Sequence, residues 1–130
     1  SAAGDYFGRP IVSADFNGDG RGDLVVGSDR FSFTSGTRPT LFLYRGDIAD
    51  TPGGGPVTVT TGSAHAVVYG ETGSNNLATA LAAGDVNGDG FPDLVAADST
   101  LTAGVRLGAG VVYVIFGGPN FFSTPVHDLA

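Results

Sequence analysis

The chain has 130 residues, of which 42% are hydrophobic and 15% are charged, so it can form the packed core of one ordinary domain and is not an intrinsically disordered segment. Thirteen acidic residues against six arginines give a net charge of −7, which argues against binding to nucleic acids or to anionic membrane surfaces. The absence of cysteine excludes disulfides and thiolate metal sites, and no apolar run approaches the roughly 20 residues of a transmembrane helix.

Short apolar runs in the first half of the chain predict β-strands. They are rich in β-branched and aromatic residues, which favour strands. They do not alternate strictly between apolar and polar residues, which is typical of strands covered on both faces. Residues 31–39 are predicted to form a long loop between the second and third strands. The predicted strands are Ile11–Ala14, 23–27, 40–44 and Ala66–Tyr69, with 57–60 as a further candidate.

The second half of the chain predicts elements of the same kind. Helical periodicity is found only at residues 77–83, where it is weak and overlaps a candidate strand. Residues 100–108 are predicted to form a second long loop, and a partner is expected to bind at such loops. The strands predicted here are 81–84, 93–97 and 110–116.

The two halves are copies of one unit. An offset of 70 residues places IVSADFNGDGRGDLVVG (11–27) over LAAGDVNGDGFPDLVAA (81–97). After one further residue of slippage, LFLYRG (41–46) lies over VYVIFG (112–117). Self-similarity at a fixed spacing is the signature of a repeat architecture, so the chain is predicted to contain the same supersecondary unit twice.

The loop between the first two strands of each repeat carries side-chain oxygens at its positions 1, 3, 5 and 9. Gly18 and Gly20 allow the backbone to turn through positive φ, so that the oxygens can point at one centre. Position 7 would add its backbone carbonyl oxygen. Such a set of hard oxygen ligands suits calcium better than zinc or magnesium, and the sequence predicts two calcium ions, one in each repeat. The predicted ligands are Asp15, Asn17, Asp19, Arg21 and Asp23 in the first loop, and Asp85, Asn87, Asp89, Phe91 and Asp93 in the second.

Other constructions of such a loop are disfavoured. A hairpin turn with solvated acids would explain one loop, but the return of all four oxygen positions in the second copy favours a metal. An EF-hand needs a bidentate Glu at position 12, where this chain has Val26 and Ala96. Dockerin modules also need an acid at that position, and the amphipathic helices that flank both kinds of loop are missing.

The segments DFNGDGRGDLVVG and DVNGDGFPDLVAA resemble the calcium loops of FG-GAP repeats, which occur in the β-propeller of integrin α-subunits and in many bacterial surface and secreted proteins. Tyr6-Phe7-Gly8 and GVVYVIFGG (110–118) match the family's elements on either side of the loop, whereas the second repeat has Leu77-Ala78 in place of Phe-Gly. The resemblance implies an all-β fold with two propeller blades of four antiparallel strands and calcium between the first two strands of each. It also implies a location outside the cell, at its surface or in the periplasm.

The blades are predicted at residues 1–70 and 71–130, and the outer strand of the second blade is expected to be missing or supplied by another chain. A propeller typically needs 4–8 blades to close. We therefore expect neighbouring blades from a longer parent chain, or self-assembly of several copies into a closed propeller.

The sequence contains no nucleophile–base set and no phosphate-binding or dinucleotide-binding glycine pattern, so an enzyme is not predicted. The first hypothesis is a calcium-stabilised module that binds or displays a protein or another ligand. The alternatives are a carbohydrate-binding propeller, which the absence of Trp weakens, and an accessory module of a larger secreted enzyme. The triplets Arg21-Gly22-Asp23 and Arg45-Gly46-Asp47 spell an integrin-binding motif, but Gly and Asp are so abundant that both are attributed to chance.

Overall fold

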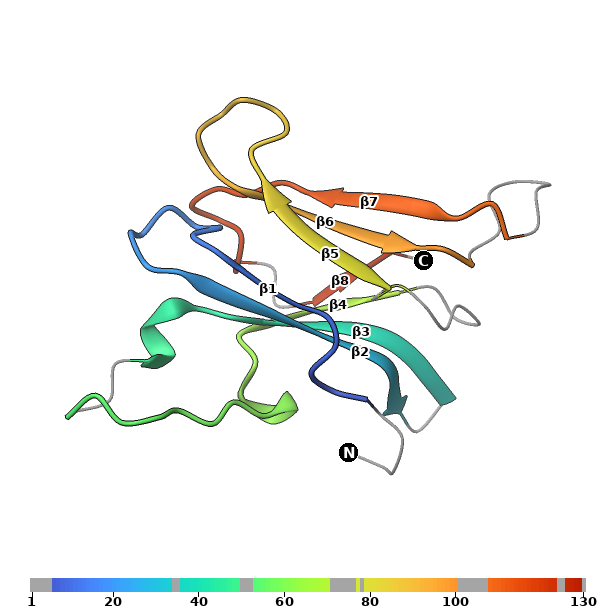
Figure 1. Cartoon of the computed structure of the whole chain (residues 1–130), viewed down its shortest axis with the longest axis horizontal. Helices are drawn as coiled ribbons and strands as arrows, with labels where there is room; N and C mark the ends of the chain where they lie inside the picture. Colours follow the sequence, from blue (N-terminus) through green and yellow to red (C-terminus); the bar gives the residue numbers. More distant parts are fainter. Residues whose placement is uncertain are drawn as a thin grey trace.

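The computed structural model describes residues 6–33, 36–49, 53–70, 77, 79–100, 108–123 and 126–129. The strands form two sheets (Figure 1). Across the first sheet they follow the order β1 (Ile11–Ala14), β2 (Asp23–Phe33), β3 (Gly36–Tyr44), β4 (Ala66–Tyr69) and β8 (Val126–Asp128). The second sheet has the order β5 (Ala80–Gly84), β6 (Asp93–Asp98) and β7 (Val111–Ile115). The helical elements in the described ranges are two 3₁₀ turns, η1 (Gly46–Ala49) and η2 (Thr61–Ser63).

The predicted all-β fold is confirmed. Strands β1 to β4 pair antiparallel in sequence order, as do β5 to β7, and the two antiparallel sheets correspond to partial propeller blades. Equivalent residues have equivalent partners, since Ala14 pairs with Asp23 in the first sheet and Gly84 pairs with Asp93 in the second. The sequence repeat is therefore a repeat of strand pairing.

Strand β8 is an addition that the sequence did not predict. It comes from the second half of the chain but pairs in parallel with β4 of the first sheet, with Val67 opposite Val126. The N–H of Leu129 donates to the carbonyl oxygen of Tyr69 at 3.0 Å and continues the pairing. The first sheet thus gains a fifth strand, whereas three strands of the second sheet lie in the described part of the chain.

Three sequence-based expectations about local structure are wrong. Residues 31–39 were expected to be a loop, but their described part lengthens β2 and β3 into one hairpin. Residues 57–60 form no strand, because they lie across the face of the first sheet, where the Tyr44 hydroxyl donates to the Thr60 carbonyl oxygen at 2.8 Å. The helical pattern at 77–83 gives way to β5 from Ala80 onward, because pairing with β6 overrides a weak local preference. Residues 101–107, most of the other predicted loop, lie outside the described ranges.

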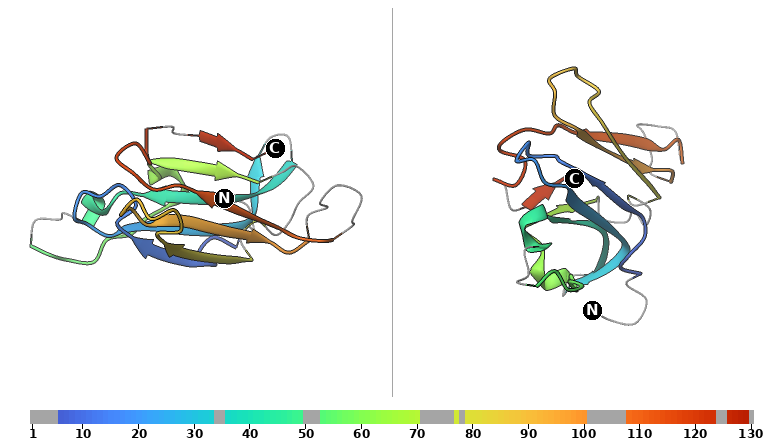
Figure 2. Two further views of the ribbon diagram at one scale, coloured as in Figure 1. Left: turned by 90° about the horizontal axis from the view of Figure 1, so that it is seen from above. Right: turned by 60° about the vertical axis from the view of Figure 1, so that its left-hand side comes forward.

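The main hydrophobic core lies between the two sheets, which are stacked as layers (Figure 2). The first sheet contributes Leu41 and Leu43, which are fully buried, and the second contributes Leu94 and Ala96. Full burial of a side chain such as Leu contributes about 1.5–3 kcal/mol, so this interface holds the two repeats together.

A second cluster covers the opposite face of the first sheet. Its buried members are Val26, Phe42 and Tyr44. Residues from the segment that follows β3 pack against them, among them Ile48 and Val59. The first sheet is therefore covered on both faces, as its apolar runs predicted, on one face by the second repeat and on the other by its own chain.

Candidate metal centre

The first loop, between β1 and β2, is organised by the side chain of Asp15. Its Oδ1 accepts a hydrogen bond from the backbone N–H of Asp19 at 3.0 Å, and its Oδ2 accepts one from Gly20 at 2.8 Å. The loop turns at Gly18 and Gly20, which have φ values of 74° and 86°, a region that glycine adopts without strain. The predicted glycine turns are thus present.

Asn17 and Asp19 are joined side by side within this turn. The Asn17 Oδ1 accepts from the Asp19 N–H at 3.1 Å, and the Asn17 Nδ2 donates to Asp19 Oδ2 at 3.0 Å. The other oxygen of Asp19 accepts from the Arg21 N–H at 2.9 Å. The hydrogen bond from Asn17, followed by that from the Arg21 backbone, lowers the pKa of Asp19, so this carboxylate is ionised at neutral pH.

Asp23 lies beneath the loop and is fully buried. Its Oδ2 accepts from the Phe16 N–H at 3.0 Å, and its Oδ1 accepts from the Gly46 N–H, just past β3, at 2.9 Å. Burial raises the pKa of Asp23, while the hydrogen bonds from the backbone of Gly46 and Asn17 oppose that change. The acid at position 9 therefore ties the loop to the end of the third strand.

The second loop, between β5 and β6, repeats these contacts. Asp85 accepts from the Asp89 N–H at 3.1 Å and from the Gly90 N–H at 2.8 Å. Asn87 Nδ2 donates to Asp89 Oδ2 at 2.9 Å, and the Phe91 N–H donates to Asp89 Oδ1, also at 2.9 Å. The buried Asp93 again accepts from a glycine past the third strand, Gly117, at 2.9 Å. Two further bonds also correspond. The N–H that follows the first acid donates to the acid at position 9, in Phe16 and Val86 alike. The N–H of the acid at position 5 donates to the Asn at position 3, in Asp19 and Asp89 alike.

Gly46 and Gly117 belong to the same construction, although sequence reasoning did not single them out. A Cβ atom at Gly46 would lie 2.6 Å from the Gly22 carbonyl oxygen, and one at Gly117 would lie 2.1 Å from the Pro92 carbonyl oxygen. Both positions bring the end of the third strand against the loop, where a side chain has no room. Their alignment at the ends of LFLYRG and VYVIFG was the available signal.

The predicted ligands of each loop are neighbours along a tight turn, but they are not gathered around one point. Among the residues that the structure describes, no group of three or more Asp, Glu, His or Cys side chains is placed to hold a metal ion. The carboxylates instead accept backbone N–H groups, and those of Arg21 and Phe91 are among the donors. The donor chemistry of both loops, carboxylate and amide oxygens without nitrogen or sulfur, fits calcium.

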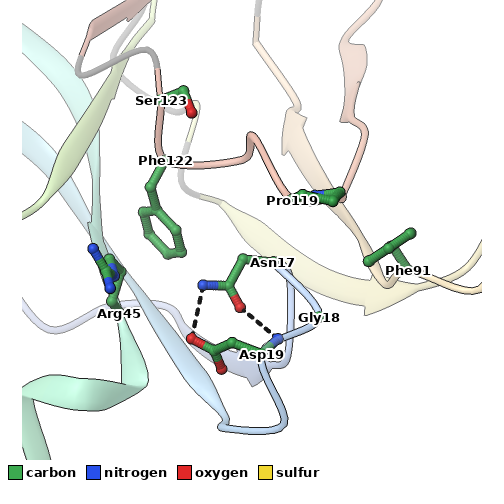
Figure 3. Close-up of a pocket in the computed structure, with 8 residues that line it drawn as sticks. All are labelled: Asn17, Gly18, Asp19, Arg45, Phe91, Pro119, Phe122 and Ser123. Atoms are coloured by element: carbon green, nitrogen blue, oxygen red, sulfur yellow. Dashed lines mark hydrogen bonds between the residues drawn. The ribbon is translucent and has the colours of Figure 1, made fainter.

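A pocket of about 490 Å³ opens beside the first loop (Figure 3). In Figure 3 the Phe122 ring points toward Asn17 and Asp19, with Arg45 on one side and Phe91 on the other. The pocket therefore combines residues of both loops with the segment that follows β7. Its lining residues are Asn17, Gly18, Asp19, Arg45, Phe91, Pro119, Phe122 and Ser123.

Neither Arg-Gly-Asp triplet is presented as a free motif. Asp23 of the first triplet is buried beneath the loop. In the second triplet the Arg45 guanidinium binds the Asp47 carboxylate at 2.8 Å, and Gly46 donates to Asp23. The two triplets are thus linked to each other through the fold, and the charged ends of the second one are paired.

The repeated acidic loop, the strand pairing on either side of it and the stacked sheets define a β-propeller-like repeat, and the comparisons with known proteins identify its family. A sequence model described as an FG-GAP-like repeat matches residues 15–96, more than half of the chain. The chain belongs to this family.

The chain is similar to parts of two kinds of longer protein. It is 36% identical over 112 residues to phosphatidylinositol-glycan-specific phospholipase D of Rattus norvegicus, and 35% identical over 117 residues to the Homo sapiens protein of that name. Each match covers 85% of this chain and 13% of the relative. It is also 31% identical over 117 residues to integrin alpha-PS2 of Drosophila melanogaster, covering 89% of this chain and 8% of that protein. The chain thus corresponds to a small fraction of the length of these relatives.

Proposed function

We propose that the chain is a non-enzymatic, calcium-binding β-propeller module in which calcium has a structural role. The observation that carries this proposal is the recurrence, 70 residues apart, of one set of hydrogen bonds around two all-oxygen loops. A solvated turn does not require the same four oxygen-bearing residues twice, whereas two cation loops do.

The ions would be held by the residues of the two loops. Asp15, Asn17, Asp19 and Asp23 would supply side-chain oxygens in the first, with the carbonyl of Arg21. To surround an ion, the carboxylates of Asp15 and Asp19 must give up the hydrogen bonds that they accept from backbone N–H groups and bind calcium instead. That exchange is favourable because a cation relieves the repulsion between the acids and the cost of burying Asp23. The ligands of the second loop would be Asp85, Asn87, Asp89, Phe91 and Asp93.

Native mass spectrometry with and without calcium tests this proposal. Two calcium ions per chain are expected, and one ion after Asp85→Ala, which removes the first ligand of the second loop. Asp47→Ala is the matched control, because Asp47 is an acid outside both loops and should leave the stoichiometry at two. A chain that retains no calcium, or that binds it equally well after Asp15→Ala and Asp85→Ala are combined, would overturn the proposal.

A ligand would bind in the pocket beside the first loop, since it is the concave surface where both loops and the segment after β7 meet. We place the module outside the cell or at its surface, by resemblance to FG-GAP repeats in surface proteins. The described residues contain no helix long and apolar enough to cross a membrane.

Two alternatives have an observation in their favour. The pocket joins the rings of Phe91 and Phe122 to polar side chains, a combination that suits a sugar, so binding to a glycan array would favour the carbohydrate-binding alternative. The relatives named phospholipase D favour an accessory role in a larger enzyme. Hydrolase activity in this chain by itself would contradict the non-enzymatic proposal.

A further inference from the structure

The first loop contains a chemically reactive pair of neighbours, Asn17-Gly18. An asparagine followed by glycine can lose its side-chain amide, because the backbone nitrogen of the next residue attacks Cγ and glycine has no side chain to obstruct the approach. Asn is followed by Gly at two places in the chain, Asn17-Gly18 and Asn87-Gly88, and Asp-Gly follows both pairs. The two loops therefore present the same chemistry in the same local sequence, and the fold decides which pair reacts first.

The attacking nitrogen is held by a carboxylate in the second loop but not in the first. The Gly88 N–H donates to Asp85 Oδ1 at 2.7 Å. In the first loop the corresponding carboxylate, Asp15, accepts from other N–H groups, and the Gly18 N–H has no hydrogen-bond acceptor among the residues that the structure describes. An N–H that is bonded to a carboxylate is harder to deprotonate, because loss of its proton would place two negative charges side by side. This bond therefore protects the second loop, and the first loop lacks that protection.

The Asn17 side chain is polarised at the carbon that would be attacked. Its Oδ1 accepts from the Asp19 N–H at 3.1 Å, and a donor in this place stabilises the negative charge that develops on the oxygen during the attack. Its Nδ2 donates to Asp19 Oδ2 at 3.0 Å, a bond that is given up when the nitrogen leaves. Asn87 has the same two bonds, so they permit the reaction in both loops and do not distinguish between them.

Positive charge favours the reaction in the first loop. The pKa of Asp19 is lowered by hydrogen bonds from Asn17 and from the Arg21 backbone, and further by the charges of the Arg21 and Arg45 guanidinium groups. The same charges reduce the cost of an anionic nitrogen in this turn, since opposite charges stabilise each other. The second loop has Phe91 in the place of Arg21. The protecting bond and the charges thus point to the same loop.

We propose that Asn17-Gly18 is a deamidation site of the folded chain and that it reacts before Asn87-Gly88. The Gly18 nitrogen gives its proton to water and forms a bond to Asn17 Cγ. The bond from Cγ to Nδ2 then breaks, and Nδ2 takes a proton from water and leaves as ammonia. Gly18 is exposed and lines the pocket of Figure 3, so water reaches the succinimide ring. Water opens this ring at one carbonyl or the other, and residue 17 becomes aspartate or isoaspartate.

Either product changes the first loop. Each adds a negative charge, which takes the net charge from −7 to −8, and each replaces the Nδ2 donor by an oxygen, so that two carboxylates face each other where Asn17 and Asp19 are now joined. Isoaspartate also lengthens the main chain by a methylene carbon, inside a turn whose hydrogen bonds span two to five residues. The inference does not depend on calcium binding.

Peptide mass analysis of the incubated chain measures both sites at once. Trypsin cuts after arginine, and the fragment that ends at Arg21 contains Asn17 and no other Asn, whereas Asn87 lies in fragment 46–106. The chain is incubated at neutral pH, in the buffer, with or without calcium, in which circular dichroism shows it folded. Asn17 should deamidate about tenfold faster than Asn87, because breaking a hydrogen bond to a charged group costs about that factor. Equal rates at the two sites, or a faster reaction of Asn87, overturns the proposal.

Unfolding and two variants show whether the fold is responsible. In urea both sites should react at similar rates, because their Asn-Gly-Asp-Gly sequences are identical. Asn17→Gln should abolish the fast release of ammonia by the folded chain, since glutamine would have to close a larger ring, and Asn87→Gln should leave that release unchanged. A preference for Asn17 that persists undiminished in urea would not come from the fold, and fast release from Asn17→Gln would come from another site. Either result contradicts the proposal.

Discussion

The Gly46 N–H donates to Asp23 Oδ1 at 2.9 Å, and Gly117 donates to Asp93 Oδ1 at the same distance in the second repeat. This bond joins the loop after the first strand to the end of the third strand, across the sheet. It gives the acid at position 9 a structural role in addition to the predicted metal ligation. The bond also explains why each repeat has a glycine at that point, since the N–H must approach a backbone that leaves no space for a Cβ atom.

A methyl group at this contact should destabilise the fold. In Gly117→Ala the new Cβ would lie 2.1 Å from the Pro92 carbonyl oxygen, and because both atoms belong to the backbone the strand end must shift. We expect a loss of about 1–3 kcal/mol in the free energy of unfolding, as for other overpacked sites, measured by urea denaturation.

Gly84→Ala is the control for this substitution. Gly84 has no atom within 4 Å of the position of its Cβ, and the change should stay within about 0.5 kcal/mol. If the two variants unfold at the same urea concentration, the close approach at Gly117 does not constrain the fold.

Removal of calcium should lower the melting temperature. A ligand that binds only the folded state stabilises it by about 2.7 kcal/mol per site at a hundredfold of its Kd, so EDTA should produce a marked fall in a thermal melt. Asp19→Ala should reproduce part of that fall and reduce the response to EDTA. Asp47→Ala should behave like the wild type, because Asp47 forms an ion pair with Arg45 and belongs to neither acidic loop. An unchanged melt after chelation would refute structural calcium.

The affinity of the first loop for calcium should fall on mild acidification. Burial raises the pKa of Asp23 above the ordinary value of 3.8, so this carboxyl takes up a proton at a pH where an exposed Asp is still ionised. In the calcium-free protein this proton is bound more tightly in the folded than in the unfolded state. Its stabilising contribution is therefore present at low pH and is lost as the pH rises through the folded pKa. Calcium must displace the same proton.

Calcium titrations of Asp85→Ala at several pH values would measure this effect at the first loop alone. The affinity should begin to fall while the pH is still above 3.8, because Asp23 protonates before Asp19, whose pKa is lowered. An affinity that holds constant down to pH 3.8 would mean that calcium displaces no proton from Asp23, and hence that Asp23 is not a ligand.

The two acidic loops could be predicted from the sequence because their geometry depends on residues close together in the chain. Asp15 and Gly20 are five residues apart, and their hydrogen bond depends only on residues between them. The first four strands were also predictable, since each is a short apolar run whose pairing partner is the next strand along the chain. Repetition of the pattern then identified the family from very few residues.

The parts that could not be predicted depend on distant contacts. Strand β8 has three residues and pairs with β4, about 60 residues earlier in the chain, and nothing in so short a run selects that partner. Residues near Thr60 look like a strand but bond to the Tyr44 hydroxyl. Gly46 and Gly117 would be compatible with many kinds of turn. Only the close approach of the Gly22 and Pro92 carbonyl oxygens explains why a glycine stands at each position.

The different surroundings of Phe16 and Val86 provide the sharpest comparison between the two repeats. Both follow the first acid of their loops, and the backbone N–H of each donates to the acid at position 9. Phe16, however, is buried against Phe121, and truncation of such a ring to alanine costs about 3–5 kcal/mol. Val86→Ala removes an exposed side chain and should cost less than about 0.5 kcal/mol. Urea denaturation of both variants measures the two losses. Similar losses for the two variants would mean that Phe16 is no better buried than Val86. The second repeat would then not cover the first loop as it does in the structure.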